Sequence, residues 1–120
     1  PGRLDHRRDR TKPMSAQMGH CHDITLRKDG PLAKMTGTDS AGVNSLHGQG
    51  IDKVAPGMTV EATAPDSTIE ALSLNGASAF TVGVQWHPEF DAEENSFSRA
   101  LFEAFGDAAR VRAEQRRNSR

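Results

Sequence analysis

The sequence predicts an α/β fold in which several strands, two of them in a β-hairpin, precede a long C-terminal helix. Two strand-like runs, MTVEATA and TIEALSL, flank the turn-forming residues Pro65-Asp66-Ser67, which indicates a hairpin. The next run, AFTVGVQW, is almost continuously apolar, as in a strand covered on both faces. From Ser96 onward, apolar side chains recur at the spacing of an amphipathic helix: Phe97, Leu101, Phe105 and Ala108, with Phe102 and Ala109 beside them.

The elements before the hairpin are assigned in chain order. Residues 1–20 show no periodicity, so we expect a loop or arm. The run HDITL alternates in His22, Ile24 and Leu26, which predicts a strand that ends at Asp29-Gly30. The run PLAKM predicts a helical turn. The run GVNSLHGQGI begins as a strand and becomes a loop at its two glycines, Gly48 and Gly50.

The elements after the hairpin complete the predicted domain. Pro88 stops the apolar run because it donates no backbone hydrogen bond. The acidic loop DAEEN follows, and its last residue, Asn95, is suited to cap the C-terminal helix. We therefore divide the chain into an arm at residues 1–20, a domain at 21–110 and a basic tail at 111–120.

The composition limits the classes of protein that fit. Leu, Ile, Val and Phe account for 21 of the 120 residues, and the net charge is only -1, so we expect a folded domain whose small core needs a partner surface. One cysteine forms no internal disulfide, which favours the cytoplasm. The first residues do not resemble a signal peptide, and no apolar run approaches the roughly 20 residues of a membrane span, so we expect no membrane contact. The basic ends lack aromatic residues, so we expect no nucleic-acid partner.

The segment GVQWHPEF carries the strongest candidate for chemistry. His87 directly follows the end of the apolar run, and an extended backbone would point His87 and Glu89 to the same side. A carboxylate beside an imidazole holds its tautomer and stabilises its charged form, as in the base half of a catalytic triad. The alternative is a surface histidine and glutamate without chemistry. The spacing alone favours that alternative, because such pairs are common.

The histidines also raise the question of a metal. His20 and His22 alternate and would share one strand face, but two ligands are too few for a closed zinc site, which needs four. His6 or His47 would join them only through the tertiary fold. We therefore expect no metal site and no cofactor.

The segment GVQWHPEF closely resembles the catalytic His-Pro-Glu segment of class I glutamine amidotransferases. Three further segments, in the same order, resemble the gamma-glutamyl-gamma-aminobutyrate hydrolase branch of that superfamily: VNSLHGQGI, VEATAPDSTIEALSL and SRALFEAFGDAAR. His6-Arg7 and HDITL also fit this branch. The resemblance implies a three-layer, flavodoxin-like α/β domain, of which this chain forms the C-terminal portion with its hairpin and helix.

The resemblance also implies a mechanism and a substrate class. A cysteine thiolate would attack a small-molecule gamma-glutamyl amide, with His87 as the base and Glu89 as the residue that orients it. The loop SLHGQG would shape the glutamyl pocket through backbone groups around His47, Gly48 and Gln49. The alternative for that loop is a tight turn that needs glycine for its conformation only. The family's known reaction belongs to putrescine degradation.

The chain departs from the family pattern at the nucleophile. The family places its cysteine in a G-x-C-x-G elbow, and no such elbow occurs here. The single cysteine, Cys21, lies in MGHCHDI without flanking glycines, so we expect a structural thiol. The chain therefore resembles the C-terminal half of a domain of roughly 240 residues, inactive alone, with the N-terminal half as its partner. A smaller departure is Ser67, where the family often has glycine.

Two other functions stay open. The chain could be half of a different class I glutaminase that supplies ammonia to a synthase, or a non-catalytic interaction or binding module derived from the family. The sequence leaves open both the amine released and a homo-oligomer.

Overall fold

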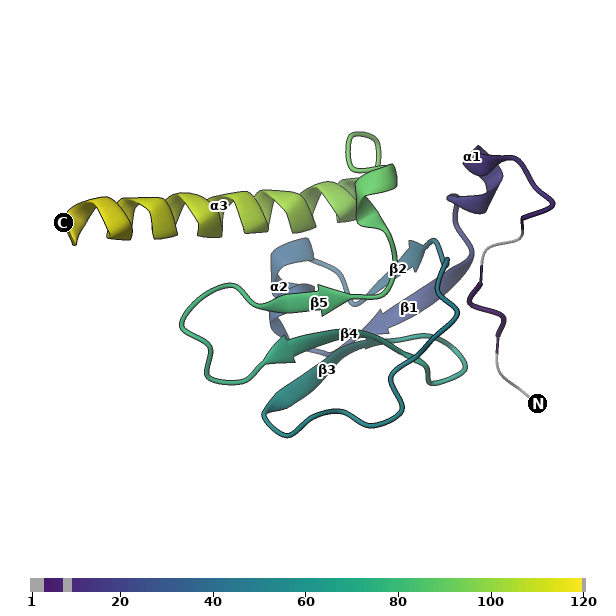
Figure 1. The fold of residues 1–120 in the computed structure, drawn as a ribbon, viewed down its shortest axis with the longest axis horizontal. Coiled ribbons are helices and arrows are strands. Elements are labelled where there is room, and N and C mark those ends of the chain that lie inside the picture. The colour runs from purple at the N-terminus through teal and green to yellow at the C-terminus, as the bar shows by residue number, and fades with distance from the viewer. Residues whose placement is uncertain (1–3, 8–9, 120) are drawn as a thin grey trace.

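The computed structural model describes residues 4–7 and 10–119. The elements in chain order are α1 (Met14–Gln17), β1 (His22–Leu26), α2 (Pro31–Thr36), β2 (Ser40–Val43), β3 (Met58–Thr63), β4 (Ile69–Leu74), β5 (Val82–Val84), a 3₁₀ helix (Pro88–Phe90) and α3 (Ser96–Asn118). The strands form one sheet in the order β2-β1-β3-β4-β5, and every pairing is antiparallel. The predicted α/β class, with its hairpin and its C-terminal helix, is confirmed (Figure 1).

The hairpin between β3 and β4 contains two irregularities, and each leaves a glutamate out of register. Val60 pairs with Leu72 and Ala62 with Ala71, so Glu61 is an extra residue on β3. Thr63 then pairs with Ile69, so Glu70 is an extra residue on β4. A β-bulge changes the direction of its extra side chain. Both carboxylates are 0% exposed, and they are among the four largest fully buried side chains.

The hairpin turn is tight enough to require a left-handed residue. Ser67 has φ 70°, so the position at which related sequences often carry glycine does need a positive φ here. A side chain in this conformation costs on the order of 1 kcal/mol relative to glycine. The turn persists because its backbone is bonded on both sides: the Ser67 N–H donates to the Ala64 carbonyl and the Ala64 N–H donates to the Thr68 carbonyl.

The hydrophobic core lies between the sheet and the helices α2 and α3 (Figure 1). Its largest members come from each of these layers: Ile24, Leu26, Leu32, Val43, Trp86, Phe97 and Leu101. Trp86 and Phe97 bring the end of β5 against the start of α3, with ring centroids 6.0 Å apart. The core is small, and several large apolar side chains of α3 remain exposed, among them Phe102, Phe105 and Val111.

The prediction that residues 80–86 form a strand buried on both faces is wrong. Only Val82–Val84 is a strand, and it lies at the edge of the described sheet, where it pairs with β4 alone. Gly83 is exposed, while Val82 and Val84 are half-buried. An apolar run shows that a segment can be covered, but the covering layer is a property of the tertiary structure, which the run itself does not reveal.

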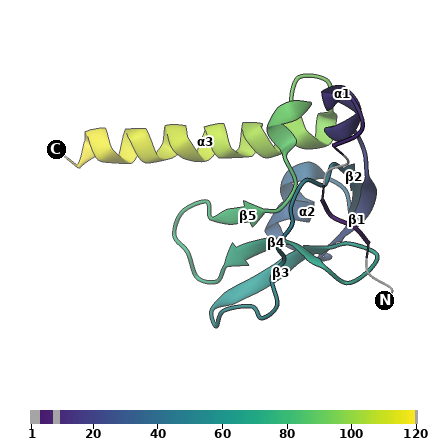
Figure 2. The same cartoon turned by 45° about the vertical axis from the view of Figure 1, so that its right-hand side comes forward.

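The two ends of the chain differ in structure. Within the described part of the arm, α1 has four residues and the remainder is irregular. At the other end, α3 begins after Asn95, whose side chain accepts hydrogen bonds from the backbone N–H groups of Phe97 and Ser98, as expected of an N-cap. The helix continues through residues 111–118, where we placed a basic tail, and projects beyond the sheet (Figure 2). No helix within residues 4–7 and 10–119 combines the length and apolarity needed to cross a membrane.

Candidate active site

A histidine–glutamate pair follows β5 at the end of the sheet. His87 Nδ1 lies 2.7 Å from Glu89 Oε1. Because a carboxylate only accepts hydrogen bonds, Nδ1 carries the ring hydrogen and Nε2 presents the lone pair that can take a proton. The two side chains are 45% and 60% exposed, so the pair is open to a reacting group. Pro88 between them is buried and begins the 3₁₀ helix that brings the side chains together. The arrangement suits a general base and the residue that orients it.

Asn44 fixes the backbone of the candidate base. Its Oδ1 accepts the N–H of His87 at 2.7 Å, and its Nδ2 donates to the His87 carbonyl at 2.9 Å and to the Met18 carbonyl at 3.1 Å. Asn44 is only 6% exposed, so these bonds are made away from water. Its position directly after β2 is the only local signal of this role in the sequence.

The loop after Asn44 is anchored on the arm. The Ser45 hydroxyl and the His47 N–H both donate to the carbonyl of His6, at 2.7 and 2.9 Å. The His47 ring turns inward, with its Nδ1 2.6 Å from the Gln49 carbonyl. Gly48 and Gln49 are exposed. The loop therefore has a fixed base and an open tip.

The open tip of this loop faces the end of β5. His47, Gly48 and Gln49 line an open hollow of about 510 Å³ that also includes Gln85, two residues before His87. Neither His87 nor Glu89 lines this hollow, although the chain that carries them forms one of its walls. The structure thus brings the predicted glutamyl loop beside the strand of the candidate base, and the role of the loop in substrate binding stays a prediction.

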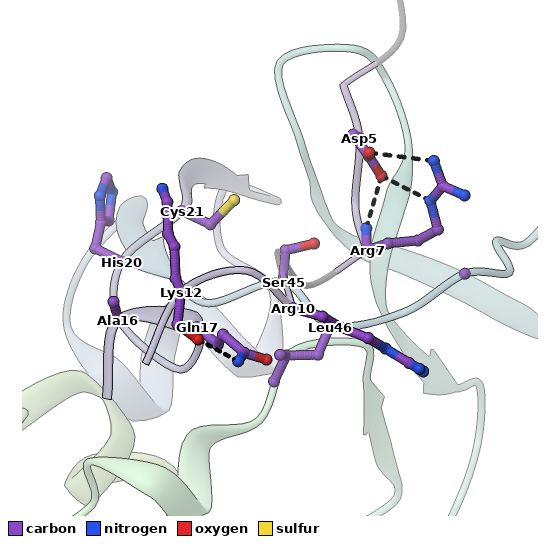
Figure 3. A pocket seen from close by; sticks show the side chains of 12 residues that line it. Asp5, Arg7, Arg10, Lys12, Ala16, Gln17, His20, Cys21, Ser45 and Leu46 are labelled. Atoms are coloured by element: carbon purple, nitrogen blue, oxygen red, sulfur yellow. Dashed lines mark hydrogen bonds and ion pairs between the residues drawn. The ribbon is translucent and has the colours of Figure 1, made fainter. Parts of the chain in front are cut away.

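The cysteine lies elsewhere. Cys21 is exposed and lines a larger open hollow of about 860 Å³ between the arm and the start of the loop (Figure 3). Basic side chains of the arm line the same hollow: Arg7, Arg10 and Lys12. Neither His87 nor Glu89 is among its lining residues. This hollow is the larger of the two, but the candidate active site is assigned to the hydrogen-bonded His87–Glu89 pair, because that pair can act as a base and its orienting residue.

Asp66 of the hairpin turn holds the arm in place. Burial alone would raise the pKa of Asp66, but hydrogen bonds from His6 Nε2 and the N–H groups of Thr68 and Leu4 outweigh burial and hold that pKa well below its usual value. The carboxylate is therefore ionised, and it accepts from all three donors at 2.9–3.0 Å. Its ionisation also fixes the hydrogen of His6 on Nε2.

A second group of titratable side chains is buried beneath the loop. His6, His22 and Glu70 place one ligand atom each within 4.8 Å of one another. His20, which we paired with His22 in sequence, is exposed and bonds instead to Asp23 at 3.0 Å. The sequence predicted that His20 and His22 share one strand face. The buried group instead joins His22 to His6 and Glu70, which lie far from it in the chain.

Comparisons with known proteins found similarity over most of the chain. Residues 1–89 match the family model described as Peptidase C26. The chain is 42% identical over 106 residues to gamma-glutamyl-gamma-aminobutyrate hydrolase PuuD of Escherichia coli (strain K12), an alignment that covers 88% of this chain and 41% of that protein. It is 31% identical over 102 residues to protein NtpR of Enterococcus hirae, covering 85% and 41%. It is 42% identical over 73 residues to the putative glutamine amidotransferase Rv2859c of Mycobacterium tuberculosis, covering 61% and 23%. The chain thus spans less than half the length of these relatives.

Proposed function

The chain belongs to the peptidase C26 family, which is class I glutamine amidotransferase-like, and on that basis we propose that it carries the base of a cysteine-dependent gamma-glutamyl amide hydrolase. His87 is the proposed base, and Glu89 orients it. The observation that carries the proposal is the 2.7 Å contact between His87 Nδ1 and Glu89 Oε1 at the end of β5. The mixed α/β fold is consistent with part of a flavodoxin-like amidotransferase domain.

The proposed reaction proceeds through a thioester. His87 Nε2 takes the proton of a cysteine thiol while the sulfur attacks the gamma-glutamyl carbonyl carbon. The C–N bond then breaks, and the imidazolium gives its proton to the leaving amine. His87 next takes a proton from water, which attacks the thioester and releases glutamate. The sulfur leaves as the thiolate and regains a proton from His87, so the site returns to its starting state. Glu89 holds Nδ1–H and stabilises the imidazolium in both steps.

The nucleophile in this proposal is a cysteine outside these 120 residues. The relatives are more than twice as long as the aligned stretch, which leaves room for such a residue in the complete protein. The proposal gives Cys21 no part in the reaction, and it is supported by the place of Cys21 in a hollow to which neither His87 nor Glu89 contributes. The 120 residues alone are therefore proposed to be inactive.

The proposed substrate pocket is formed by the loop tip. Gly48 carries no side chain, and Gly48 and Gln49 can present backbone groups to the glutamyl moiety beside Gln85. The name of the Escherichia coli relative supports gamma-glutamyl-gamma-aminobutyrate as the substrate. We further propose a cytoplasmic enzyme of putrescine degradation that acts on small molecules and binds neither nucleic acid nor membrane. The remainder of its own domain covers the open face of this chain. Whether it forms a homo-oligomer is a matter for measurement.

A second candidate function is glutamine hydrolysis. The similarity to the putative glutamine amidotransferase of Mycobacterium tuberculosis favours it, because the same thioester route releases ammonia from glutamine. The complete coding sequence that contains these residues should be expressed and assayed for glutamate release from both amides. The proposal predicts a larger kcat/KM for gamma-glutamyl-gamma-aminobutyrate. A preference for glutamine supports the second candidate, and no release from either amide supports a non-catalytic module.

A further inference from the structure

We propose that His6, His22, His47 and Glu70 form a buried, four-ligand binding site for a divalent transition-metal ion, with Zn²⁺ the best match to the donor set. This site is separate from the proposed catalytic pair and has a structural role. The four residues come from the arm, β1, the loop and β4, so one ion would join segments far apart in the sequence.

The three imidazoles surround a single carboxylate oxygen. Glu70 Oε1 lies 3.1 Å from His6 Nδ1, 3.4 Å from His47 Nε2 and 3.7 Å from His22 Nε2. The side chain of Glu70 is 0% exposed, and those of His6, His22 and His47 are 9%, 6% and 12% exposed. The His6 ring lies 4.9 Å, centroid to centroid, from each of the other two rings. Ligand atoms of His6, His22 and Glu70 lie within 4.8 Å of one another, and His47 joins this group through its contact with Glu70.

The outer nitrogen of each ring faces an acceptor. His6 Nε2 lies 2.9 Å from the ionised Asp66 carboxylate. His22 Nδ1 lies 2.9 Å from the carbonyl oxygen of the next residue along β1. His47 Nδ1 lies 2.6 Å from the carbonyl oxygen two residues ahead in the loop. Because these groups only accept, each outer nitrogen carries a ring hydrogen, so the inner nitrogen of a neutral ring turns its lone pair toward Glu70.

The carboxylate of Glu70 and the nitrogens that face it therefore lack a hydrogen-bond donor between them. Within the described residues, no hydrogen bond reaches either carboxylate oxygen of Glu70, or the Nε2 atoms of His22 and His47. His6 Nδ1 has the Ser45 hydroxyl as a partner at 3.3 Å, and its 3.1 Å distance to Glu70 Oε1 does not have hydrogen-bond geometry. A buried charge and buried acceptors without a donor are strongly unfavourable, and a cation among them removes the conflict.

Glu61 is also a fully buried carboxylate, and it has the hydrogen-bond donors that a buried carboxylate usually has. Glu61 also occupies a bulge of the hairpin, and its oxygens accept from Arg27 Nη2 at 2.9 Å and from the Ser73 hydroxyl at 2.6 Å. Glu70 has three imidazoles where Glu61 has a guanidinium and a hydroxyl. The bulge on β4 aims Glu70 into this group, which a regular strand position would not do.

The arrangement fits a metal better than a proton. A proton on one ring would supply one donor and leave two lone pairs facing the carboxylate. Three imidazole nitrogens and one carboxylate oxygen are a usual donor set for Zn²⁺. The outer contacts, a carboxylate behind His6 and carbonyls behind His22 and His47, are those that orient metal-bound histidines. Ligand bonds of about 2.0–2.1 Å require the side chains to close in.

Metal content tests the site directly. The protein from the complete coding sequence should be treated with a chelator, supplied with Zn²⁺ and dialysed. Its metal should then be counted by inductively coupled plasma mass spectrometry, and its Tm measured with and without Zn²⁺. The proposal predicts about one site-bound Zn²⁺ per chain and a higher Tm with the metal. Co²⁺ in its place should give the intense visible bands of a tetrahedral site.

Substitutions distinguish this site from adventitious binding. His22→Ala and His47→Ala should each lose the bound metal and the Tm increase, while His20→Ala, an exposed neighbour of His22, should keep both. His47→Ala changes a loop residue, so it tests the site even where His22→Ala fails to fold. The proposal is overturned when wild-type protein shows no Tm increase and no site-bound Zn²⁺, since protons then hold the cluster. It is equally overturned when His20→Ala loses as much metal as His47→Ala.

Discussion

The carboxamide of Asn44 forms hydrogen bonds with both the N–H and the C=O of His87, although the two residues lie 43 positions apart in the chain. The side chain thus occupies the place that a neighbouring strand would take. It fixes the backbone of His87 directly, while Glu89 fixes the ring. Asn44 is therefore a positioning residue for the proposed base.

Asn44→Ala should lower kcat of the complete protein about 10- to 100-fold, because a small displacement of a catalytic group costs about that much. KM should change little, since Asn44 is not placed in the substrate pocket. Steady-state kinetics on folded protein, confirmed by circular dichroism, give both constants. Asn75→Ala is the matched control, because Asn75 is exposed in the turn directly after β4, and it should keep the wild-type kcat and KM. A change in KM alone would contradict a positioning role.

Cys21 should not form the acyl-enzyme. The hollow that it lines receives no contribution from His87 or Glu89, so the proposed base is not available to it. Treatment of the complete protein with an electrophilic gamma-glutamyl analogue, followed by peptide mass spectrometry, should place the label on another cysteine. Stoichiometric labelling of Cys21 that disappears in His87→Ala would instead make Cys21 the nucleophile.

Asp66 should make stability depend on acid pH. Its pKa is lowered in the folded state, so its contribution is complete above the unfolded pKa of about 3.9 and is lost as pH falls through the folded pKa. Asp66→Asn should lower the free energy of unfolding near pH 7 by about 1–3 kcal/mol, and the difference from wild type should shrink below about pH 4. Urea unfolding of the complete protein at several pH values measures this.

The control for that measurement is Asp52→Asn, which changes an exposed aspartate in the loop before β3. It should leave the wild-type pH dependence intact. If Asp66→Asn keeps the full wild-type loss of stability in acid, the hydrogen bonds to Asp66 do not contribute as described.

The isolated 120 residues should be marginally stable and should self-associate. Phe105 and Val111 of α3 are 57% and 53% exposed, and each large apolar side chain left in water forgoes roughly 1.5–3 kcal/mol. Light scattering and a thermal melt test this prediction. Val111→Gln should reduce association without lowering Tm. A monodisperse wild-type monomer with a sharp, cooperative transition would show that the small core suffices alone.

Local signals in the sequence predicted the local structure. Alternation predicted β1, the turn residues predicted the hairpin, and Asn95 was correctly assigned as the helix cap. The positive φ of Ser67 agrees with the resemblance, in which glycine is common at this position of the turn. Each of these features depends on residues within a few positions of one another, so sequence alone contains the relevant information.

Features that depend on distant contacts were not predictable in this way. The edge position of β5 follows from its neighbours in the sheet, and no property of its own residues reveals them. The contact between His22 and Glu70 joins positions 48 apart, and it depends on a bulge that the polar–apolar pattern does not show. The sequence predicted that His87 and Glu89 lie on the same side of an extended backbone, whereas the 3₁₀ helix Pro88–Phe90 brings the two side chains together. The backbone partner of His87, Asn44, was not predicted.

Glu89→Gln should reduce turnover less than loss of the base itself. The amide can still accept from His87 Nδ1 but carries no charge to stabilise the imidazolium, so we expect kcat/KM to fall about 10- to 100-fold with the ring still in place. The measurement is glutamate release from gamma-glutamyl-gamma-aminobutyrate by the complete protein. A fall as large as that of His87→Ala would show that Glu89 does more than orient the ring.

The most direct test of the account is kcat/KM of His87→Ala in the same assay. Nucleophile and base act as a unit, so the account predicts a loss on the order of 10³- to 10⁴-fold. His20→Ala is the matched control, because His20 is also exposed and bonded to a carboxylate, Asp23, at 3.0 Å. It should stay within about twofold of wild type, a change of under 0.5 kcal/mol. Near-normal turnover by His87→Ala would contradict the account and leave GVQWHPEF as a strand end that carries a histidine.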